Sequence, residues 1–253
     1  MTKSNMHRES LKGKTALVTG AGKRVGRATA LALAGEGVNV VAHYGTSAGE
    51  VEGLRREIGE RGVEAWAVQA DLEVAEECEG LMARAVDAAG RMDILINNAS
   101  IFPASKLENV TLDDLTKAVR VNAWAPFVLS RAFARQVGRG KIVNLLDSRI
   151  KGYDRLHVAY ILSKHMLAAL TKMTALEFAP DITVNAVAPG LILPPPGKEE
   201  DYLDRLKNTV PLKRHGDPQD VTDAILFLLK SDFITGQIIY VDGGRHLRET
   251  PDG

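Results

Sequence analysis

Residues 15–26 read Thr15-Ala16-Leu17-Val18-Thr19-Gly20-Ala21-Gly22-Lys23-Arg24-Val25-Gly26. The stretch opens with a short apolar run typical of a buried strand, and a helical pattern begins at Val25. Glycines at such a turn let the backbone approach a pyrophosphate, and the helix N-terminus offers free N–H donors and the positive end of its dipole. The stretch therefore predicts a βα unit that binds a dinucleotide, the alternative being a tight turn without a ligand.

The rest of the chain repeats this alternation of short apolar runs and longer amphipathic stretches. Such a pattern predicts a parallel sheet with helices on both faces. We expect strands at residues 15–19, 38–43, 65–70, 94–97, 141–146, 183–187 and 238–241. We expect helices at residues 25–35, 48–61, 75–89, 112–137, 157–178 and 218–229. The last helix has a clear start signal, because Asp217 is a cap residue and Pro218 suits the first turn.

The chain is predicted to fold as one domain. Its 253 residues, with 45% hydrophobic content, can build a sizeable core. The polar residues 1–11 indicate a flexible tail and not a signal peptide, which leaves residues 12–253 as the domain. One break in composition occurs at residues 191–210, where a proline run precedes charged residues. A loop of this length predicts a lid or binding segment.

Charge and cysteine content exclude several classes of protein. The 32 Lys and Arg residues balance the 32 Asp and Glu residues. This balance argues against a nucleic-acid or anionic-membrane partner held by bulk charge, but leaves room for a local basic pocket. A single cysteine, Cys78, excludes an internal disulfide and predicts a reducing, cytoplasmic location. No apolar run reaches the length of a membrane span, and the scattered histidines lack ligand spacing, so no metal is expected.

The residues after the second predicted strand bear on the choice of cofactor. Proteins that bind NAD usually place an acid there to hold the ribose hydroxyls, but this chain reads His43-Tyr44-Gly45-Thr46-Ser47 and has no carboxylate before Glu50. A 2′-phosphate would meet no repulsion and would find four candidate donors, Lys23, Arg24, Thr46 and Ser47. We therefore expect NADPH. If these are ordinary turn residues, NADH would serve as well.

Polar side chains also close the third and fourth predicted strands. Asp71, followed by Leu72, is placed to accept from an adenine amino group, and the run Asn97-Asn98-Ala99-Ser100 can line a ribose. Ligands of open parallel sheets bind at this edge, beyond the carboxyl ends of the strands. Each group could instead cap the helix that follows it.

Tyr160 and Lys164 lie four residues apart on a predicted helix, so their side chains share one face. A neighbouring ammonium is expected to lower the pKa of the phenol, which could then exchange a proton with a substrate oxygen or nitrogen. The alternative is an aromatic residue at the core edge with a lysine that reaches solvent.

Together these motifs resemble the short-chain dehydrogenase/reductase family, over residues 12–247. The resemblance rests on the glycine turn, Asn97-Asn98-Ala99, Tyr160-x-x-x-Lys164, Pro189-Gly190 and Val241-Asp242-Gly243-Gly244. It implies a single Rossmann-type doubly wound α/β domain with a seven-stranded, mainly parallel sheet, usually in a homotetramer. It also implies hydride transfer between a nicotinamide and a carbonyl or imine, with Tyr160 as proton donor, Lys164 on the nicotinamide ribose, and Asn122 in the catalytic group.

Two departures from the common pattern of that family also occur in its pteridine reductase branch, which this chain resembles. Arg24 replaces the middle glycine of the turn, and Asp147 replaces the usual serine, with Ser148 next to it as the alternative in a shifted register. A buried Asp147 with a raised pKa could supply a proton, or it could orient a water or a ring nitrogen. The resemblance further implies that Phe102 stacks on the pterin ring and that Arg24 and Ser100 touch it. An arginine usual after His-Tyr in that branch is missing, since Gly45 and Thr46 stand there.

The sequence thus predicts an NADPH-dependent reductase of a dihydropterin, with dihydrofolate, dihydrobiopterin and dihydromonapterin as candidates. The alternatives are a ketoreductase of 3-oxoacyl thioesters or small ketones, and a cofactor-binding protein without turnover. The expected catalytic residues are Asn122, Asp147, Tyr160 and Lys164, and the expected substrate contacts are Arg24, Ser100, Phe102, Asp147 and Tyr160. The expected cofactor contacts are Gly20, Lys23, Arg24, Val25, Gly26, His43, Tyr44, Thr46, Ser47, Asp71, Leu72, Asn98, Ala99, Ser100, Tyr160, Lys164, Pro189 and Gly190.

Overall fold

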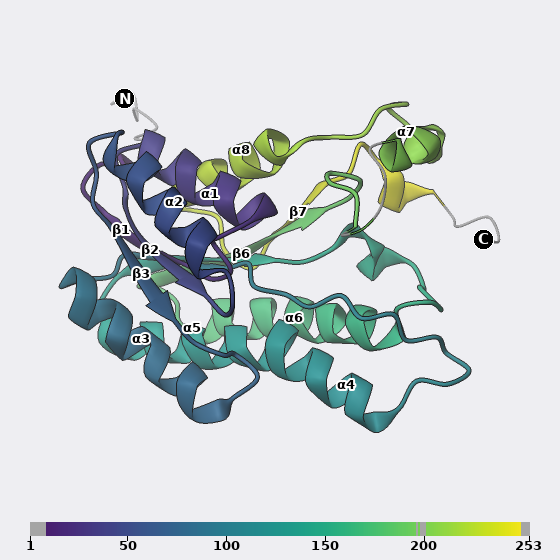
Figure 1. Cartoon of the computed structure of the whole chain (residues 1–253), viewed down its shortest axis with the longest axis horizontal. Coiled ribbons are helices and arrows are strands. Elements are labelled where there is room, and N and C mark those ends of the chain that lie inside the picture. Colours follow the sequence, from purple (N-terminus) through teal and green to yellow (C-terminus); the bar gives the residue numbers. More distant parts are fainter. Residues whose placement is uncertain (1–8, 196, 198–200, 249–253) are drawn as a thin grey trace, which may run out of the picture.

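The computed structural model describes residues 9–195, 197 and 201–248, and seven strands form one sheet at its centre (Figure 1). The strand order is β3-β2-β1-β4-β5-β6-β7, and all six neighbouring pairs are parallel. The predicted α/β class is therefore confirmed, and the sheet is parallel throughout. The strands are β1 (Thr15–Val18), β2 (Asn39–Tyr44), β3 (Ala65–Gln69), β4 (Ile94–Asn97), β5 (Gly140–Leu145), β6 (Ile182–Pro189) and β7 (Ile238–Val241).

Helices cover both faces of the sheet (Figure 1). One face packs against α1 (Arg24–Gly35), α2 (Ala48–Gly59) and α8 (Pro218–Leu229), and their apolar side chains form one core cluster with the strands. The other face packs against α3 (Ala75–Ala89), α5 (Ala125–Gln136) and α6 (Val158–Glu177), and α4 (Leu112–Val119) packs against α6. Since both faces are covered, the strands carry the continuous apolar runs expected of a buried parallel sheet.

The helix predicted at residues 112–137 is confirmed as a helical stretch, which is continuous over residues 112–136 but is not one regular α-helix. The chain forms α4, then a π-helical turn η1 (Arg120–Trp124), then α5. Pro126 lies in the first turn of α5, and a proline without an N–H cannot complete the regular hydrogen-bond ladder of an uninterrupted helix. The π-turn carries Asn122, which is fully buried. Such turns within helices frequently occur at functional sites.

The predicted lid at residues 191–210 contains structure of its own. It includes the short helix α7 (Tyr202–Leu206) and the 3-10 turn η3 (Lys207–Thr209), and residues 196 and 198–200 of that prediction lie outside the described residues. At the other end of the chain, residues 1–8 of the predicted tail also lie outside them. Leu11 is only 1% exposed, and Glu9 pairs with Lys141 at 3.1 Å. The described fold therefore begins before the predicted boundary at residue 12.

Neither a membrane-spanning helix nor a metal-binding cluster is found in the part of the chain that the structure describes. Within the described ranges, no helix combines the length and the hydropathy that a membrane crossing requires. The same residues hold no group of three or more His, Cys, Asp or Glu side chains arranged to bind a metal ion. The parallel sheet instead directs attention to the edge where its strands end, because the candidate residues after β1, β4, β5 and β6 all meet there.

Candidate active site

The glycine turn after β1 has no room for larger side chains. Gly20 has a positive φ of 63°, and a Cβ on Gly26 would lie 2.2 Å from the carbonyl oxygen of Gly20. A Cβ on Gly22 would lie 2.6 Å from Oγ of Ser47. The helix α1 begins directly after Lys23, whose side chain makes no capping hydrogen bond. The turn therefore has the close backbone approach and the helix N-terminus that suit a pyrophosphate.

His43 and Asn98 hold this turn in place from behind. The backbone N–H of Gly20 donates to Nδ1 of His43 at 3.1 Å, and the other ring nitrogen lies 3.0 Å from the carbonyl oxygen of Ala70. Burial lowers the pKa of His43 to about 4, although the backbone hydrogen bond to Ala70 raises it. Asn98 donates through Nδ2 to the carbonyl oxygens of Thr19 and Gly20, at 2.8 and 3.1 Å. His43 thus supports the turn as a neutral, buried side chain, with both ring nitrogens next to backbone groups.

The charge balance at the turn differs from the expected one. Lys23 forms an ion pair with Glu50 at 2.6 Å, and the Lys23 ammonium lowers the pKa of that carboxyl. Glu50 lies in the first turn of α2, just after β2. It therefore reaches the glycine turn, although it is distant from Lys23 in the sequence. Both side chains are half-exposed, and solvent weakens such a pair, so an incoming phosphate can compete for Lys23. Of the other expected donors, Thr46 is exposed and Ser47 is half-buried.

The polar residues at the ends of β3 and β4 differ in burial and in the groups that they contact. Asp71 is exposed and accepts at 2.9 Å from the backbone N–H of Glu73 in the turn before α3, whose N-cap residue is Val74, and Leu72 is buried beside it. Asn97 points into the interior and donates to Asn144 at 2.8 Å, so the expectation that it lines a ribose is wrong. Neighbouring strand residues face opposite sides, which explains why Asn98 reaches the turn and Asn97 does not.

At the end of β5, the structure brings three of the four expected catalytic residues together. The Tyr160 hydroxyl donates to Oδ2 of Asp147 at 2.9 Å. Nζ of Lys164 donates to the carbonyl oxygen of Leu145 at 2.8 Å and lies 5.7 Å from the centroid of the Tyr160 ring. Ser148 is only 3% exposed, so the register that points Asp147 at Tyr160 holds and the shifted one does not.

Asn122 makes its contacts elsewhere. Its Oδ1 accepts from the backbone N–H of Ile101 at 2.8 Å and from Oγ of Ser100 at 3.0 Å, and its Nδ2 donates to the Ile101 carbonyl and to Oγ of Ser163, both at 3.0 Å. The π-turn therefore fixes the segment after β4 that carries Phe102. None of these side-chain hydrogen bonds joins Asn122 to Tyr160 or Lys164.

Arg149, which the sequence patterns did not single out, organises the site. Its Nε and Nη2 donate to the two oxygens of Asp147 at 3.1 and 2.9 Å, and its Nη1 donates to Asp154 at 2.7 Å. The 3-10 turn η2 (Ser148–Lys151) produces this geometry, because Asp147 caps it by accepting from the backbone N–H of Arg149 at 2.8 Å. The only sequence signal was an aspartate with an arginine two residues later at the end of a strand.

These contacts reverse two expectations about pKa. Burial alone would raise the pKa of Asp147, but the hydrogen bonds and charge of Arg149 lower it below the ordinary value. Burial and the negative charge of Asp147 raise the pKa of Tyr160 well above 10, so Lys164 does not lower it. Burial lowers the pKa of Lys164 to about 8. At neutral pH the site therefore holds a carboxylate at Asp147 and a proton on Tyr160.

The ring of Phe102 lies in the cleft and not in the interior, with 37% of its surface exposed. It stacks on His157 at 4.1 Å between centroids and meets the Tyr160 ring edge-on at 4.7 Å. The Arg149 guanidinium lies 4.9 Å from the Phe102 centroid. Arg24 adopts a positive φ of 55°, which is an outlier for a bulky residue, and its Nη2 lies 3.5 Å from the Leu193 carbonyl. The cleft therefore has aromatic and cationic walls around the Tyr160 hydroxyl.

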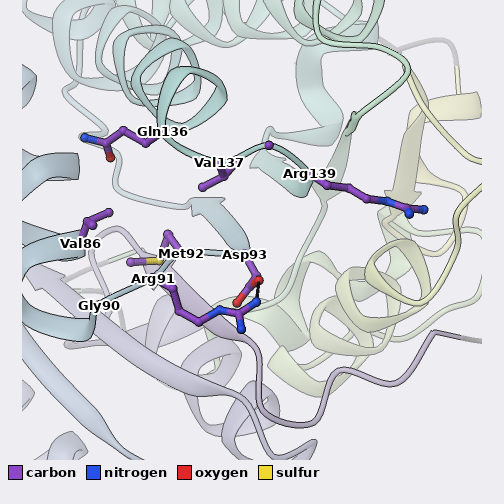
Figure 2. A pocket seen from close by; sticks show the side chains of 9 residues that line it. Val86, Gly90, Arg91, Met92, Asp93, Gln136, Val137 and Arg139 are labelled. Carbon is purple, nitrogen blue, oxygen red and sulfur yellow. Dashed lines mark hydrogen bonds and ion pairs between the residues drawn. The ribbon is translucent and has the colours of Figure 1, made fainter.

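A separate hollow of about 400 Å³ lies away from this cleft, at the start of β4 and β5 (Figure 2). In Figure 2, Arg91 points toward Asp93, with which it forms an ion pair, and Arg139 points away from both. Asp93 also accepts from the backbone N–H of Thr15 at 2.9 Å. These groups tie strand ends together, and parallel sheets bind ligands at the opposite edge.

Comparisons with known proteins agree with this geometry. The family model described as Enoyl-(Acyl carrier protein) reductase matches residues 20–246. The 3-oxoacyl-(acyl-carrier-protein) reductase of Staphylococcus epidermidis is 34% identical over 242 residues, which cover 92% of this chain and 99% of that protein. Among solved structures, alternative dihydrofolate reductase 1 (FolM) from Brucella canis, complexed with NADP, has a TM-score of 0.91 at 32% identity, covering 96% of this chain and 98% of that one. The reductase LugOII, which catalyses keto-reduction at C1 during lugdunomycin biosynthesis, has a TM-score of 0.87 at 33% identity, covering 94% and 100%.

Proposed function

Because the chain belongs to the short-chain dehydrogenase/reductase family, we propose that it is an NADPH-dependent reductase of a C=N bond in a dihydropterin-type substrate. Dihydrofolate, dihydrobiopterin and dihydromonapterin are the candidate substrates. One observation carries this proposal: a carboxylate at Asp147, held ionised by Arg149, accepts from Tyr160 beside the exposed ring of Phe102. A pterin offers amino and ring N–H donors to such a carboxylate and a flat ring to Phe102, whereas a simple ketone offers neither.

The glycine turn supports NADPH as the cofactor. The backbone around Gly20, Gly22 and Gly26, with the N-terminus of α1, would hold the pyrophosphate, and Thr46 and Ser47 would donate to the 2′-phosphate. Lys164 would bind the nicotinamide ribose. The NADP complex of the similar Brucella canis reductase supports the same choice. NADPH, when bound, supplies the hydride for the ring carbon of the C=N bond.

The side chains of the site would then deliver a proton to the ring nitrogen of the substrate. Tyr160 keeps its proton at neutral pH and would donate it to the ring nitrogen as that atom gains negative charge. Asp147 would hold the substrate by its N–H groups and would not itself be a proton source, since Arg149 keeps it ionised. The carbon gains a hydride, the nitrogen gains a proton, and solvent returns a proton to Tyr160. Phe102 would stack on the substrate ring, with Arg24 and Ser100 at its edge.

The similarity to the Staphylococcus epidermidis enzyme favours a second candidate function, reduction of a 3-oxoacyl thioester or small ketone. In that case Asp147 would be a tolerated substitution for serine and Phe102 would only line an apolar wall. A cofactor-binding protein without turnover is the third alternative. The Tyr160 and Lys164 pair argues against it, because a binder needs no acid–base group.

The experiment that decides between them measures NADPH oxidation with dihydrobiopterin and with an acetoacetyl thioester. We expect turnover of the dihydropterin, and we expect Phe102→Ala to lower its kcat/KM about tenfold through lost ring stacking. Phe233→Ala is the matched control, since Phe233 is fully exposed outside the site. Turnover of the thioester alone, at a rate that Phe102→Ala leaves unchanged, would establish the second function. NADPH binding without turnover of either would establish the third.

A pH experiment tests the role assigned to Arg149. In the wild-type protein its charge holds the pKa of Asp147 below the ordinary value, so the carboxylate persists as the pH falls. In Arg149→Met, burial, which raises the pKa of Asp147, is opposed only by the hydrogen bonds from Tyr160 and from the backbone N–H of residue 149. We expect the acidic limb of kcat/KM with dihydropterin to move up by about one pH unit or more, and Arg149→Lys to restore part of that shift. An acidic limb at the same pH in all three proteins contradicts this role.

The same proposal extends to the assembly and the lid. Apolar side chains remain exposed on α4 and α6, with Leu112 at 79%, Met173 at 63% and Leu176 at 83%. Copies of the chain packed through these helices would bury them, which supports a homotetramer.

The segment 191–210, which includes α7, would close over the substrate as the lid of the single domain 12–253.

A further inference from the structure

A partly buried arginine lies at the outer end of the cleft without a carboxylate partner. Arg245 begins the 3-10 turn η4 (Arg245–Leu247), and η4 packs against η2, the turn that carries Arg149. Among the described residues, its guanidinium forms no ion pair and no side-chain hydrogen bond. A partly buried cation without a counter-ion is costly, so the charge of Arg245 calls for an anion from outside the chain.

The carboxylates near Arg245 are already used. Asp242 accepts from the backbone N–H groups of Gly244 and His246, at 3.0 and 2.6 Å, and from the His246 ring at 2.9 Å. Asp147 and Asp154 are both bound to Arg149. Burial lowers the pKa of Arg245, and the positive charge of Arg149 lowers it further. The two guanidinium groups therefore lie within electrostatic reach of each other, and the charges of Asp147 and Asp242 also reach Arg245 and raise its pKa, but neither carboxylate forms an ion pair with it.

The position of Arg245 is fixed by its turn. Gly243 and Gly244 have φ values of 63° and 85°, and a Cβ on Gly243 would lie 2.5 Å from Cγ1 of Val210. The backbone N–H of Leu212 donates to the Gly243 carbonyl at 3.3 Å. Figure 1 shows the C-terminal segment beside α7, and Tyr202 of that helix interacts electrostatically with Arg245. Arg245 therefore lies between the catalytic turn η2 and the segment expected to act as the lid.

Lys151 adds a further positive charge to the same region. It lies on η2, with Nζ 5.8 Å from the centroid of the Tyr240 ring, and that ring stacks on His246 of η4 at 4.1 Å. The net charge of the whole chain is zero. Among the described residues, neither Lys151 nor Arg245 forms an ion pair, so two unpaired cations lie along η2 and η4, next to the turn that carries Arg149.

We propose that Arg245 forms a subsite for an anionic group, a carboxylate or a phosphate, carried on the side chain of the substrate. This inference rests on the proposed function and narrows it to dihydropterins with a charged tail. The ring would occupy the cleft between Phe102 and Tyr160, and the tail would extend along η2 to Arg245. A guanidinium is the side chain best suited to either anion, because its fork of N–H donors matches both.

The test compares two dihydropterins in the wild type, Arg245→Gln and Arg248→Gln. Dihydrofolate carries carboxylates on its tail and dihydrobiopterin carries none. We expect Arg245→Gln to raise KM for dihydrofolate about tenfold or more, with kcat unchanged and with dihydrobiopterin unaffected. Arg248→Gln is the matched control, because Arg248 is an exposed arginine directly after the same turn. Equal effects of Arg245→Gln on both substrates, or no effect on either, overturn the subsite.

Two competitors identify the anion and separate this inference from the proposed function. Inhibition of dihydrobiopterin reduction by p-aminobenzoylglutamate indicates a carboxylate subsite, inhibition by inorganic phosphate indicates a phosphate subsite, and Arg245→Gln should abolish either. If no dihydropterin is reduced and only thioesters are, the proposed function fails. The same variant is then compared on acetoacetyl-CoA, which carries phosphates, and on the uncharged N-acetylcysteamine thioester. A KM increase confined to the CoA ester supports the anion subsite, and equal KM values overturn it.

Discussion

A Tyr160→Phe variant is expected to lose about 10²–10⁴-fold in kcat, which is the usual contribution of a positioned general acid. The hydroxyl keeps its proton at neutral pH and lies 2.9 Å from Oδ2 of Asp147, and unlike the Arg149 guanidinium beside it, a phenol can give up a proton as a general acid. Phenylalanine keeps the ring that packs edge-on against Phe102. Folding and NADPH binding should therefore persist while proton delivery fails.

The measurement is single-turnover reduction with NADPH, together with fluorescence titration of NADPH binding. Tyr153→Phe is the matched control, since Tyr153 is 93% exposed on the loop after η2. It should react at the wild-type rate. If Tyr160→Phe keeps more than about a tenth of wild-type kcat, proton delivery comes from another group and the role proposed for Tyr160 is wrong.

The sequence predicted the fold well because its signals were local. The strand Ile94–Asn97 and the helices Ala75–Ala89 and Pro218–Leu229 have the predicted bounds. Asp217 caps the last helix by accepting from Gln219 at 2.7 Å, as the Asp-Pro signal indicated. Such periodicities and caps depend only on neighbours along the chain. The π-turn at Arg120–Trp124 could not be predicted from the hydrophobic periodicity, because a π-turn preserves most of the apolar face of a helix.

The electrostatics of the site could not be predicted in the same way. The predicted pKa of Asp147 considered burial alone, whereas the structure adds the fork of Arg149. The predicted effect of Lys164 on Tyr160 assumed that four residues of spacing bring the two polar atoms together. The ammonium is instead directed to the Leu145 carbonyl. Helical spacing fixes which face a side chain shares, but not the partner that its last atom finds.

An Asp147→Ser variant is expected to separate the two reductase functions. Serine is the residue that the family commonly places there, so the change removes the carboxylate and keeps a hydroxyl near Tyr160. We expect kcat/KM for dihydropterin to fall about 10²-fold or more, because the substrate N–H groups lose a charged acceptor. Reduction of a small ketone should be retained or should increase, since a ketone needs only a donor hydroxyl at its oxygen.

This variant also leaves Arg149 with Asp154 as its one remaining carboxylate. The Arg149 side chain is 32% exposed, so solvent offsets part of the loss, and we expect a destabilisation of about 1–2 kcal/mol by urea unfolding. The double variant Asp147→Ser/Arg149→Met also removes Arg149 and leaves Asp154 with His157 and the backbone N–H of Leu156, so it should differ from Asp147→Ser in stability without recovering dihydropterin reduction. The single and the double variant would then differ in stability but lose the same activity, dihydropterin reduction. Because stability differs and activity does not, the loss of activity is due to the missing carboxylate and not to unfolding. Dihydropterin reduction at the wild-type rate in Asp147→Ser would show that the carboxylate has no part in recognising the substrate.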